Sequence, residues 1–412
     1  MVGTGSNKPV LVVGGGISGI TTAVELAEAG REVVLVEERP YLGGNVVRMN
    51  NYFPKLCPPA CGLEINFRRI RQNPRISYYT SSTVVDISGE HGNFTVQIKT
   101  SAQYVKNNCT ACGECVDVCP VERPDEFNYS LSKTKTIYLP HEMAFPMKYA
   151  IDSRYCKKGN CNKCAEACKY NAIDFSVEDK ERILEVHSIV FATGWHNYDA
   201  SKLDNLSYLS SPDIVTNVEF ERLLAPNGPN KGKLVKPSDQ SEPRDITFVQ
   251  CAGSRDENHL PYCSAVCCSA SLKHALTIRE KLPQCRVNIF YIDLRVSGRN
   301  EDFLDKVKEE KNIELIKGKV GRVEQNKENG KLVVEAEDIQ NEIKLKHETD
   351  MVVLATGIVP NKPPVDIRTN PEGFLAVEQE KGIIVASCSK KPMDVSSSVK
   401  DANAAALKAI QQ

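Results

Sequence analysis

The stretch Val10–Gly19, which reads VLVVGGGISG, decides the fold of the N-terminal part of the chain. Its apolar beginning predicts a buried strand, and its glycines predict a tight turn. The next segment, Ile20–Ala29, has the apolar spacing of a helix and stops at Gly30, a favoured helix terminator. A second apolar strand, Glu32–Val36, follows and closes at an acidic residue. A strand–turn–helix–strand unit of this kind predicts a Rossmann-type α/β domain.

The glycine positions in this turn suit a bound dinucleotide. Gly14 allows the tight turn, Gly16 lets the backbone approach a pyrophosphate, and Gly19 lets helix and strand pack closely. The helix N-terminus then faces the phosphate charge, and Glu37, eighteen positions after Gly19, accepts a hydrogen bond from a ribose hydroxyl. A glycine-rich turn without a ligand is the alternative, but the flanking strand, helix and acidic residue favour the nucleotide site.

Further glycine-containing segments favour FAD over NAD. Gly43-Gly44 comes just after the acidic residue, and two strands end in Ala-Thr-Gly, at 192–194 and 355–357. Together these features resemble the thioredoxin reductase type of flavoprotein, which has two dinucleotide-binding domains. In that family the acidic residue binds the adenosine ribose and the Gly-Gly segment passes close to the flavin. The residues expected to bind FAD are Gly14, Gly15, Gly16, Ile17, Ser18, Gly19, Glu37, Glu38, Gly43, Gly44, Asn45, Val84, Ala192, Thr193, Gly194 and Gly357.

Length, composition and charge narrow the class of protein. A chain of 412 residues is longer than one core usually spans, so two or three domains are expected. The formal net charge of −1 provides no field that would attract nucleic acid. No stretch approaches the roughly 18 apolar residues of a transmembrane helix, and Met1–Lys8 lacks a signal-peptide layout. We therefore expect a cytoplasmic protein without a transmembrane segment of its own.

The spacing of the 16 cysteines indicates iron–sulfur clusters, because cytoplasmic proteins rarely use cysteine in disulfides. Residues 109–120 read C-x2-C-x2-C-x3-C-P, the run of bacterial ferredoxins, and residues 156–168 form a partner run with a longer first gap. The fourth cysteine of such a run ligates the other cluster. We expect one [4Fe–4S] cluster on Cys109, Cys112, Cys115 and Cys168, and another on Cys119, Cys156, Cys161 and Cys164. Structural zinc is the alternative, although zinc knuckles lack a four-cysteine run ending in proline.

A third group of cysteines lies in a second strand–turn–helix–strand unit that begins at Asp245. Cys251-Ala252-Gly253-Ser254-Arg255 stands where the glycine turn of a nucleotide site would follow the strand Ile246–Gln250. NAD(P) binding by this domain is therefore not expected. Four cysteines can instead hold a third cluster near the flavin, with buried or reactive thiols as the alternative. These four are Cys251, Cys263, Cys267 and Cys268.

The remaining cysteines and the histidines give weaker signals. Cys57-Pro58-Pro59-Ala60-Cys61 is a redox dithiol near the flavin, a source of extra ligands or a structural pair, whereas Cys285 and Cys388 are most simply small buried apolar residues. His187, His196, His259 and His274 are scattered and are interpreted as structural, with His259 the first to check because it lies between two cysteines of the third group. No Ser/His/Asp or paired-carboxylate arrangement is found, which suits electron transfer without acid–base catalysis.

The whole set of motifs resembles the A-type subunit of heterodisulfide reductase, from about Val10 to the end of the chain. The resemblance rests on GGGISG, on FPKLC at 53–57, on the ferredoxin insert and on the Cys-x11-Cys-x3-Cys-Cys group. It extends to Pro392–Val395, where the family places a helix N-terminus and backbone beside the flavin, which implies that Asp394 also contacts FAD.

The compact form of the chain looks most like the A-type subunit of the quinone-interacting membrane-bound oxidoreductase complex of sulfate reducers. This resemblance implies two partner subunits, one that carries flavin and iron–sulfur clusters and one that oxidises quinone in the membrane. It also implies adenylylsulfate reductase as the electron partner and a peripheral location at the inner face of the cytoplasmic membrane.

The expected fold class is α/β, with two Rossmann-type, thioredoxin reductase-like domains and an inserted ferredoxin-like α+β module. The FAD domain would comprise 1–104, 179–243 and 346–412, the insert 105–178, and the second nucleotide-binding-like domain 244–345, with a polar linker at 224–243.

We interpret the protein as an oxidoreductase subunit in which FAD interconverts one- and two-electron transfer and the clusters carry electrons. The alternatives are a heterodisulfide reductase-type subunit, with or without electron bifurcation, a stand-alone NAD(P)H-dependent reductase, and an assembly subunit whose clusters are structural.

Overall fold

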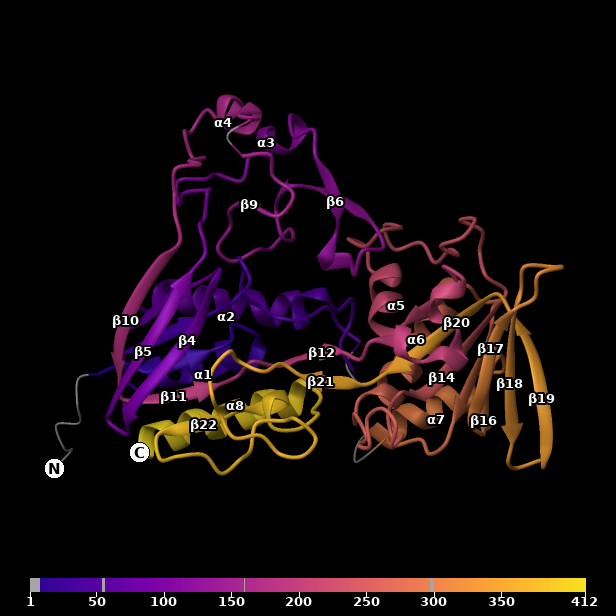
Figure 1. Ribbon diagram of the computed structural model, residues 1–412. Coiled ribbons are helices and arrows are strands. Elements are labelled where there is room, and N and C mark those ends of the chain that lie inside the picture. The colour runs from indigo at the N-terminus through magenta and orange to yellow at the C-terminus, as the bar shows by residue number, and fades with distance from the viewer. Residues whose placement is uncertain (1–7, 54–55, 159, 297–299) are drawn as a thin grey trace.

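The computed structural model describes residues 8–53, 56–158, 160–296 and 300–412, which form two α/β domains and an insert. Figure 1 shows the first domain at the left, the second at the right and the insert above the first. Residues 1–7 lie outside the described residues, as do Pro54 and Lys55 of the FPKLC segment.

A five-stranded parallel sheet forms the centre of the first domain, in the order β22-β11-β1-β2-β3. Val10 and Val12 of the central strand pack against helices, whereas Leu11 and Val13 face an antiparallel three-stranded sheet on the other side. The elements are β1 (Val10–Val13), α1 (Ile17–Glu28), β2 (Val33–Val36), α2 (Ala60–Gln72), β3 (Ile76–Tyr79), β4 (Ser82–Glu90), β5 (Asn93–Thr100), β10 (Lys180–Val186), β11 (Ser188–Phe191), β22 (Ile383–Val385) and α8 (Val395–Gln411).

Helix α1 begins at Ile17, three residues earlier than the apolar spacing predicts. Gly16 takes the extended backbone conformation of an N-cap, so the chain turns directly from β1 into the helix. The helix stops at Glu28, just before Gly30, whose φ of 89° is left-handed and favours glycine. The N-terminus of α1 is thereby placed at the carboxyl end of the sheet.

The second domain repeats this layout around a parallel sheet in the order β13-β20-β14-β15-β16. Ile246 and Phe248 of its strand β14 pack on the helical side, and Val249 packs on the side of a second antiparallel sheet. The elements are β13 (Ile214–Thr216), α5 (Asn217–Leu224), β14 (Asp245–Ala252), α6 (Cys267–Lys281), β15 (Arg286–Tyr291), α7 (Glu301–Glu309), β16 (Ile313–Lys317), β17 (Val320–Gln325), β18 (Leu332–Asp338), β19 (Ile343–Thr349) and β20 (Met351–Thr356).

Two expected domain boundaries differ from the membership of the sheets. The sequence places β13 in the FAD domain, within 179–243, and β20 in the C-terminal part of that domain, within 346–412. Both strands lie in the second sheet, because β20 pairs with β14 on one side and with β13 on the other. The polar stretch 224–243 is therefore a loop inside the second domain and not a linker between domains.

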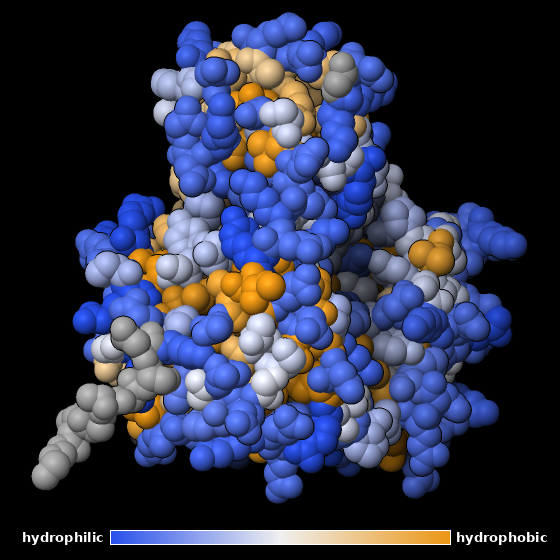
Figure 2. All heavy atoms as spheres, turned by 60° about the vertical axis from the view of Figure 1, so that its left-hand side comes forward, coloured by the Kyte–Doolittle hydropathy of each residue, from blue (hydrophilic) through white to orange (hydrophobic). Residues whose placement is uncertain are grey.

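The chain crosses between the domains in two short strands, β12 (Trp195–Asn197) and β21 (Ile358–Pro360), which pair antiparallel. The insert between β5 and β10 forms a lobe above the body, with hydrophobic atoms visible near its top among mostly hydrophilic ones (Figure 2). Its short elements are α3 (Glu114–Asp117), β6 (Glu122–Pro124), β7 (Lys133–Lys135), β8 (Ile137–Tyr138), β9 (Ala150–Ile151) and α4 (Lys163–Ala167). Within the described parts of the chain, every helix falls short of the length or hydropathy that crossing a membrane requires.

A buried guanidinium group, that of Arg222 in α5, joins the insert to both domains. Its Nε donates to Oδ1 of Asn128 in the insert and its Nη1 donates to the carbonyl oxygen of Arg48 in the first domain, each at 2.8 Å. Its Cζ lies 4.8 Å from the centre of the Phe127 ring, a cation–π contact. These contacts fix the position of the insert relative to both sheets.

The imidazole of His141 is half-buried at the same junction, with its Nε2 atom inside. It stacks on Phe127, with 5.5 Å between ring centres, and its Nε2 has no hydrogen-bond partner. Burial, reinforced by the charge of Arg222, lowers the pKa of His141 to about 4. The folded protein therefore keeps this histidine neutral at a pH where the unfolded chain would bind a proton.

We predict that His141 makes the stability of this junction fall as the pH falls from 6.5 to about 4. The unfolded chain binds the extra proton in that window, so the full loss approaches about 3 kcal/mol. His141→Phe should flatten the pH dependence of amide hydrogen exchange in the β6–β7 hairpin. His196→Phe, at an exposed position, is the matched control. An undiminished pH dependence in His141→Phe would show that other groups cause it.

Candidate functional site

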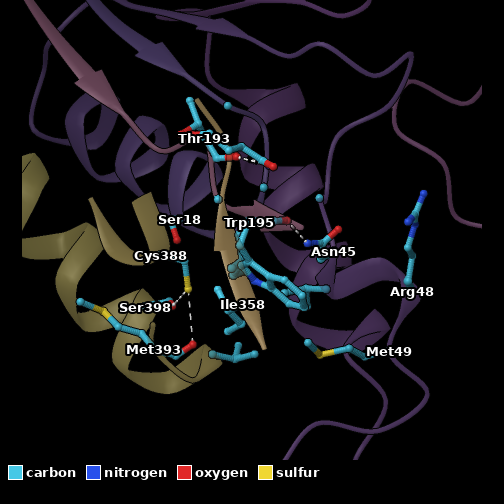
Figure 3. A pocket seen from close by; sticks show the side chains of 18 of the residues that line it. Ser18, Asn45, Arg48, Met49, Thr193, Trp195, Ile358, Cys388, Met393 and Ser398 are labelled. Carbon is cyan, nitrogen blue, oxygen red and sulfur yellow. Dashed lines mark hydrogen bonds between the residues drawn. The ribbon is translucent and has the colours of Figure 1, made fainter. Parts of the chain in front are cut away.

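A cavity of about 330 Å³ lies between the two α/β domains, at the carboxyl end of the first sheet. Its walls come from the turn before α1, the segment after β2, the segment after β11, and helices α5 and α6 of the second domain. Figure 3 shows the Trp195 ring in the middle of this space, between Asn45 and Ile358. The volume and the position between domains are those of small-molecule and cofactor sites.

Glycines shape the end of the cavity that adjoins α1. Gly14 has a φ of 108°, and a Cβ on it would lie 2.3 Å from the carbonyl oxygen of Ala192. A Cβ on Gly19 would lie 1.7 Å from the carbonyl oxygen of Gly14, so only glycine lets the helix approach the strand this closely. Gly16 and Ser18 line the cavity beside the N-terminus of α1, where backbone N–H groups favour an anion such as a pyrophosphate.

Glu37 is buried in the wall at the end of β2. Its Oε2 accepts the N–H of Gly15 at 2.5 Å, and its Oε1 accepts the N–H of Arg39 at 2.8 Å. Burial raises the pKa of Glu37, while these hydrogen bonds oppose the rise. A carboxylate oxygen can accept a second hydrogen bond, so Glu37 retains the capacity to bind a hydroxyl in the cavity.

The structure brings most of the expected FAD residues to this cavity. Gly15, Gly19 and Gly43 lie behind its wall. The N–H of Gly43 donates to the carbonyl oxygen of Gly15 at 2.7 Å, and Gly19 packs on β1. Gly357 does not fit the prediction, because it follows β20 and a Cβ on it would lie 2.4 Å from Oγ of Ser254 in the second domain. The expected residues that line the cavity are Gly14, Gly16, Ile17, Ser18, Glu37, Glu38, Gly44, Asn45, Val84, Ala192, Thr193, Gly194 and Asp394.

Several further lining residues were not expected from the sequence. Trp195 carried one usable signal, since it is the only tryptophan and follows Ala-Thr-Gly directly. Nδ2 of Asn45 donates to its carbonyl oxygen at 2.6 Å, which ties the second glycine segment to β12 (Figure 3). Cys388, expected to be a plain buried residue, lines the cavity and donates to the carbonyl oxygen of Met393 at 3.4 Å. Others are Arg48, Met49, Tyr52, Asn217, Glu221, Lys273, His274, Arg295 and Asn361.

The second-domain wall of the cavity carries a buried charged network. Oε2 of Glu221 accepts from Nζ of Lys273 at 2.5 Å and from Nε2 of His274, while Oε1 accepts the N–H groups of Asn50 and Asn51 from the first domain. Burial alone would raise the pKa of Glu221, but the charge of Lys273 and the bond from His274 hold it well below its usual range. Burial and Lys273 lower the pKa of His274. The network thus presents a fixed ammonium–carboxylate pair to the cavity and ties the domains together.

The insert gathers its cysteines into two separate sets, each around a small cavity. The first cavity is lined by Cys109, Cys112, Cys115 and Cys168, and the second by Cys119, Cys156, Cys161 and Cys164. This division is the one expected if the last cysteine of each run crosses to the other cluster. The thiols are spread around the cavity walls; within the described residues, no three His, Cys, Asp or Glu side chains converge on a single ion position.

Two of these thiols are buried, one in each set. Burial, with neighbouring thiols adding to it, raises the pKa of Cys115 to about 12 and that of Cys164 to about 11. A cationic metal centre among the thiols would displace these protons and stabilise the thiolates. The donor sets therefore fit iron–sulfur clusters.

The third group, Cys251, Cys263, Cys267 and Cys268, also comes together and is called the quartet below. Burial raises the pKa of Cys267, and the charges of the three other thiols raise it further, which places all four near one another. Residues 265–266 and 269–270, between and beside these cysteines, line the large cavity. The quartet thus lies behind the wall of the cavity, close to the residues that line it.

An aromatic side chain occupies the space beside the turn after β14. A Cβ on Gly253 would lie 2.8 Å from Cδ1 of Tyr198, so an aromatic ring packs against this turn. Helix α6 begins only at Cys267, after a loop that follows the end of β14 at Ala252. The geometry agrees with the expectation that this domain has lost its phosphate-binding turn.

The histidines and the remaining cysteines lie in different parts of the molecule. His274 faces the cavity, whereas His259, the first histidine to check, hydrogen-bonds through Nδ1 to the hydroxyl of Tyr198 at 2.8 Å in the quartet loop. The Cys57 thiol interacts with the hydroxyl of Tyr52, a cavity residue, and this contact raises the pKa of Tyr52. Cys61 is exposed in the first turn of α2.

Comparison with known proteins identifies the class. Residues 9–56 match the family of FAD dependent oxidoreductases, and residues 102–122 match the 4Fe-4S binding domain. The fold resembles the thioredoxin reductases of T. acidophilum (TM-score 0.54) and Lactococcus lactis (TM-score 0.53), each 13% identical and matched over 98% of both chains. The chain therefore has a thioredoxin reductase-like FAD oxidoreductase fold with a ferredoxin-like 4Fe–4S module.

Over nearly its whole length the chain is similar to A-type subunits of heterodisulfide reductase. It is 37% identical to the second iron–sulfur A-type subunit of the CoB–CoM heterodisulfide reductase of Methanopyrus kandleri, over 97% of this chain and 63% of that protein. It is 33% identical to the A-type subunit of the H(2):CoB-CoM heterodisulfide,ferredoxin reductase of Methanothermobacter thermautotrophicus, with the same coverage. The chain thus spans less than two thirds of the length of these relatives.

We predict that Gly14→Ala abolishes the retention of FAD. The added Cβ would meet the carbonyl oxygen of Ala192 at 2.3 Å and would strain a left-handed backbone. Gly30→Ala is the matched control, because Gly30 also has a positive φ but has nothing within 4 Å of an added Cβ. The control should cost only about 1 kcal/mol of stability and should keep its flavin. The flavin-to-protein ratio after gel filtration decides, and equal ratios in both variants would refute the prediction.

We also predict that pairs of cysteine replacements reveal the two sets in the insert. Cys112→Ala should remove one cluster, about four irons. Adding Cys168→Ala, in the same set, should remove no more, whereas adding Cys164→Ala, in the other set, should remove about four further irons. Iron analysis of anaerobically purified variants measures this. Equal iron losses in the two double variants would contradict the division into sets.

Proposed function

We propose that this chain is the FAD- and cluster-bearing electron-transfer subunit of a multi-subunit oxidoreductase, with two [4Fe–4S] clusters in the insert and a third on the quartet. The observation that carries the proposal is the juxtaposition of the dinucleotide-shaped cavity with the quartet behind its wall. The two four-thiol sets of the insert extend this series of redox sites away from the cavity. In such a protein the flavin and the clusters exchange electrons, and the surrounding side chains set their potentials.

The residues of the cavity have separable roles in this proposal. The turn Gly14–Ser18 and the N-terminus of α1 bind the pyrophosphate, and Glu37 binds the ribose. At the other end, Asp394 caps α8 by accepting the N–H of Ser397 at 2.7 Å, so that a second helix N-terminus lines the cavity. Bound FAD supplies the exchange of electrons singly or in pairs. Lys273 holds a proton on Nζ at the wall, and Glu221 fixes its position.

The proposal extends to the partner subunits. We infer that the chain works with two further subunits, one that carries flavin and iron–sulfur clusters and one that oxidises quinone in the membrane. In this role it relays electrons between the quinone pool and adenylylsulfate reductase. The support is the resemblance of its motifs to those of the A-type subunit of the quinone-interacting complex. The protein would then be peripheral to the cytoplasmic membrane through its partners.

A heterodisulfide reductase-type role is the second candidate, favoured by the names of the relatives. A stand-alone NAD(P)H reductase is disfavoured by the packed turn after β14. Two electron donors distinguish the first two candidates. One is a reduced menaquinone analogue, added with the membrane subunit, and the other is a thiol pair, added with heterodisulfide-type partners. The donor that reduces the flavin identifies the role.

We predict that the anaerobically purified chain contains one FAD and about twelve irons, four for each cluster. Its flavin should bleach with dithionite but not rapidly with NADH or NADPH. Absorbance at the flavin band and iron analysis test both statements. An iron content of about four or fewer would defeat the two-cluster insert, and rapid bleaching by NADH or NADPH would defeat the pure electron-relay role.

A further inference from the structure

The loop that carries the quartet also carries an arginine held in a defined position. Arg255 follows the turn after β14 with a φ of 57°, and its backbone N–H donates to the carbonyl oxygen of Tyr262 at 3.1 Å. Its Nη2 donates to Oδ2 of Asp293 at 2.9 Å. The arginine side chain is 24% exposed and that of Asp293 is 51% exposed, so the pair lies at the edge of the quartet.

The inner side of this guanidinium faces the thiols. Its charge and hydrogen-bonding capacity act on the thiol of Cys251, and its charge acts on that of Cys268 as well. Nη1 of Arg255 is buried and has no hydrogen-bond partner among the described residues. A buried N–H donor without an acceptor is costly, and here it lies beside a site that would become anionic when thiolates hold a cluster.

We propose that Arg255 is a positioning residue that raises the reduction potential of the cluster on the quartet, and that Asp293 opposes it. The inference rests on the proposed function, which places a [4Fe–4S] cluster there. Reduction adds one electron and no proton, so the cluster becomes more negative by one charge. A neighbouring cation stabilises that reduced form, and a hydrogen bond to a ligating sulfur acts in the same direction.

Because Arg255 and Asp293 carry opposite charges, replacing one or the other should move the reduction potential of the cluster in opposite directions. Asp293 neutralises part of the arginine's charge and also fixes the guanidinium, while its carbonyl oxygen accepts from the thiol of Cys268 at 3.6 Å. Asparagine in place of Asp293 removes the carboxylate charge and keeps a side-chain oxygen that can accept from Nη2 of Arg255. A second cation, Arg295, acts on Cys268 and lines the large cavity, so two positive charges act on the quartet.

The test is a redox titration of the full chain, purified anaerobically, with dithionite as reductant and cluster signals followed by electron paramagnetic resonance. The signal of the quartet is first assigned as the one that Cys267→Ala removes. Arg255→Gln should then shift the reduction equilibrium of that signal about tenfold toward the oxidised form, about 59 mV for a one-electron couple. Asp293→Asn should shift it in the opposite direction, and Arg255→Lys should retain most of the wild-type potential.

Arg286→Gln provides the matched control. It also removes one positive charge from the second domain, but Arg286 begins β15 at the amino end of the sheet, opposite to the end that carries the quartet, and its side chain is 70% exposed. It should leave the potential unchanged. A purely structural Arg255 would instead give loss of the signal, with no opposite shift in Asp293→Asn.

The outcomes separate this inference from the proposed function. An unchanged iron content and spectrum in Cys267→Ala would show that the quartet holds no cluster, and would overturn both. A signal lost in Cys267→Ala, together with an unshifted potential in Arg255→Gln or shifts of the same sign in Arg255→Gln and Asp293→Asn, would overturn only the role of Arg255.

Discussion

The contact between α1 and β1 at Gly19 is the constraint on which the flavin-side architecture depends. No side chain fits where a Cβ would lie 1.7 Å from the carbonyl oxygen of Gly14, so the helix leaves the strand at the closest possible approach. Two distant segments then join the same point: Glu37 accepts the N–H of Gly15, and Gly43 donates to its carbonyl oxygen. The backbone N–H and carbonyl oxygen of Gly15 thus hold the first strand, the second strand and the second glycine segment together.

The second domain keeps the layout of the first and changes its chemistry. In the first domain, the helix that follows β1 presents its N-terminus to a space suited to phosphate. In the second domain, the ring of Tyr198 packs at Gly253, and the helix that follows β14 begins with Cys267 and Cys268. Both helix N-termini therefore adjoin the place for an anionic group, a pyrophosphate in one case and a thiolate-bound cluster, as proposed, in the other.

The local pattern of the sequence was sufficient for the features that depend on short spacing. The strand before Gly14, the helix after it and the division of insert cysteines into two sets all follow from intervals of a few residues. Features set by long-range pairing were not accessible in this way. β20 joins the second sheet through its pairing with β14, about a hundred residues earlier in the chain, and this placement removes Gly357 from the expected FAD site. Glu221, Lys273 and His274 are likewise united only by the packing of α5 on α6.

The crossing strands β12 and β21 make the connection between the domains a two-stranded ribbon instead of two independent tethers. Trp195 pairs with Pro360 and Asn197 with Ile358, and the N–H of Asn361 donates to the carbonyl oxygen of Gly194 just beyond the ribbon. A paired ribbon resists shear between its strands but tolerates twist. Any rotation of one domain against the other must therefore turn Trp195 and Ile358 as a unit, and both side chains line the cavity. The ribbon that joins the domains also lines the cavity, so the shape of the cavity depends on the angle between the domains.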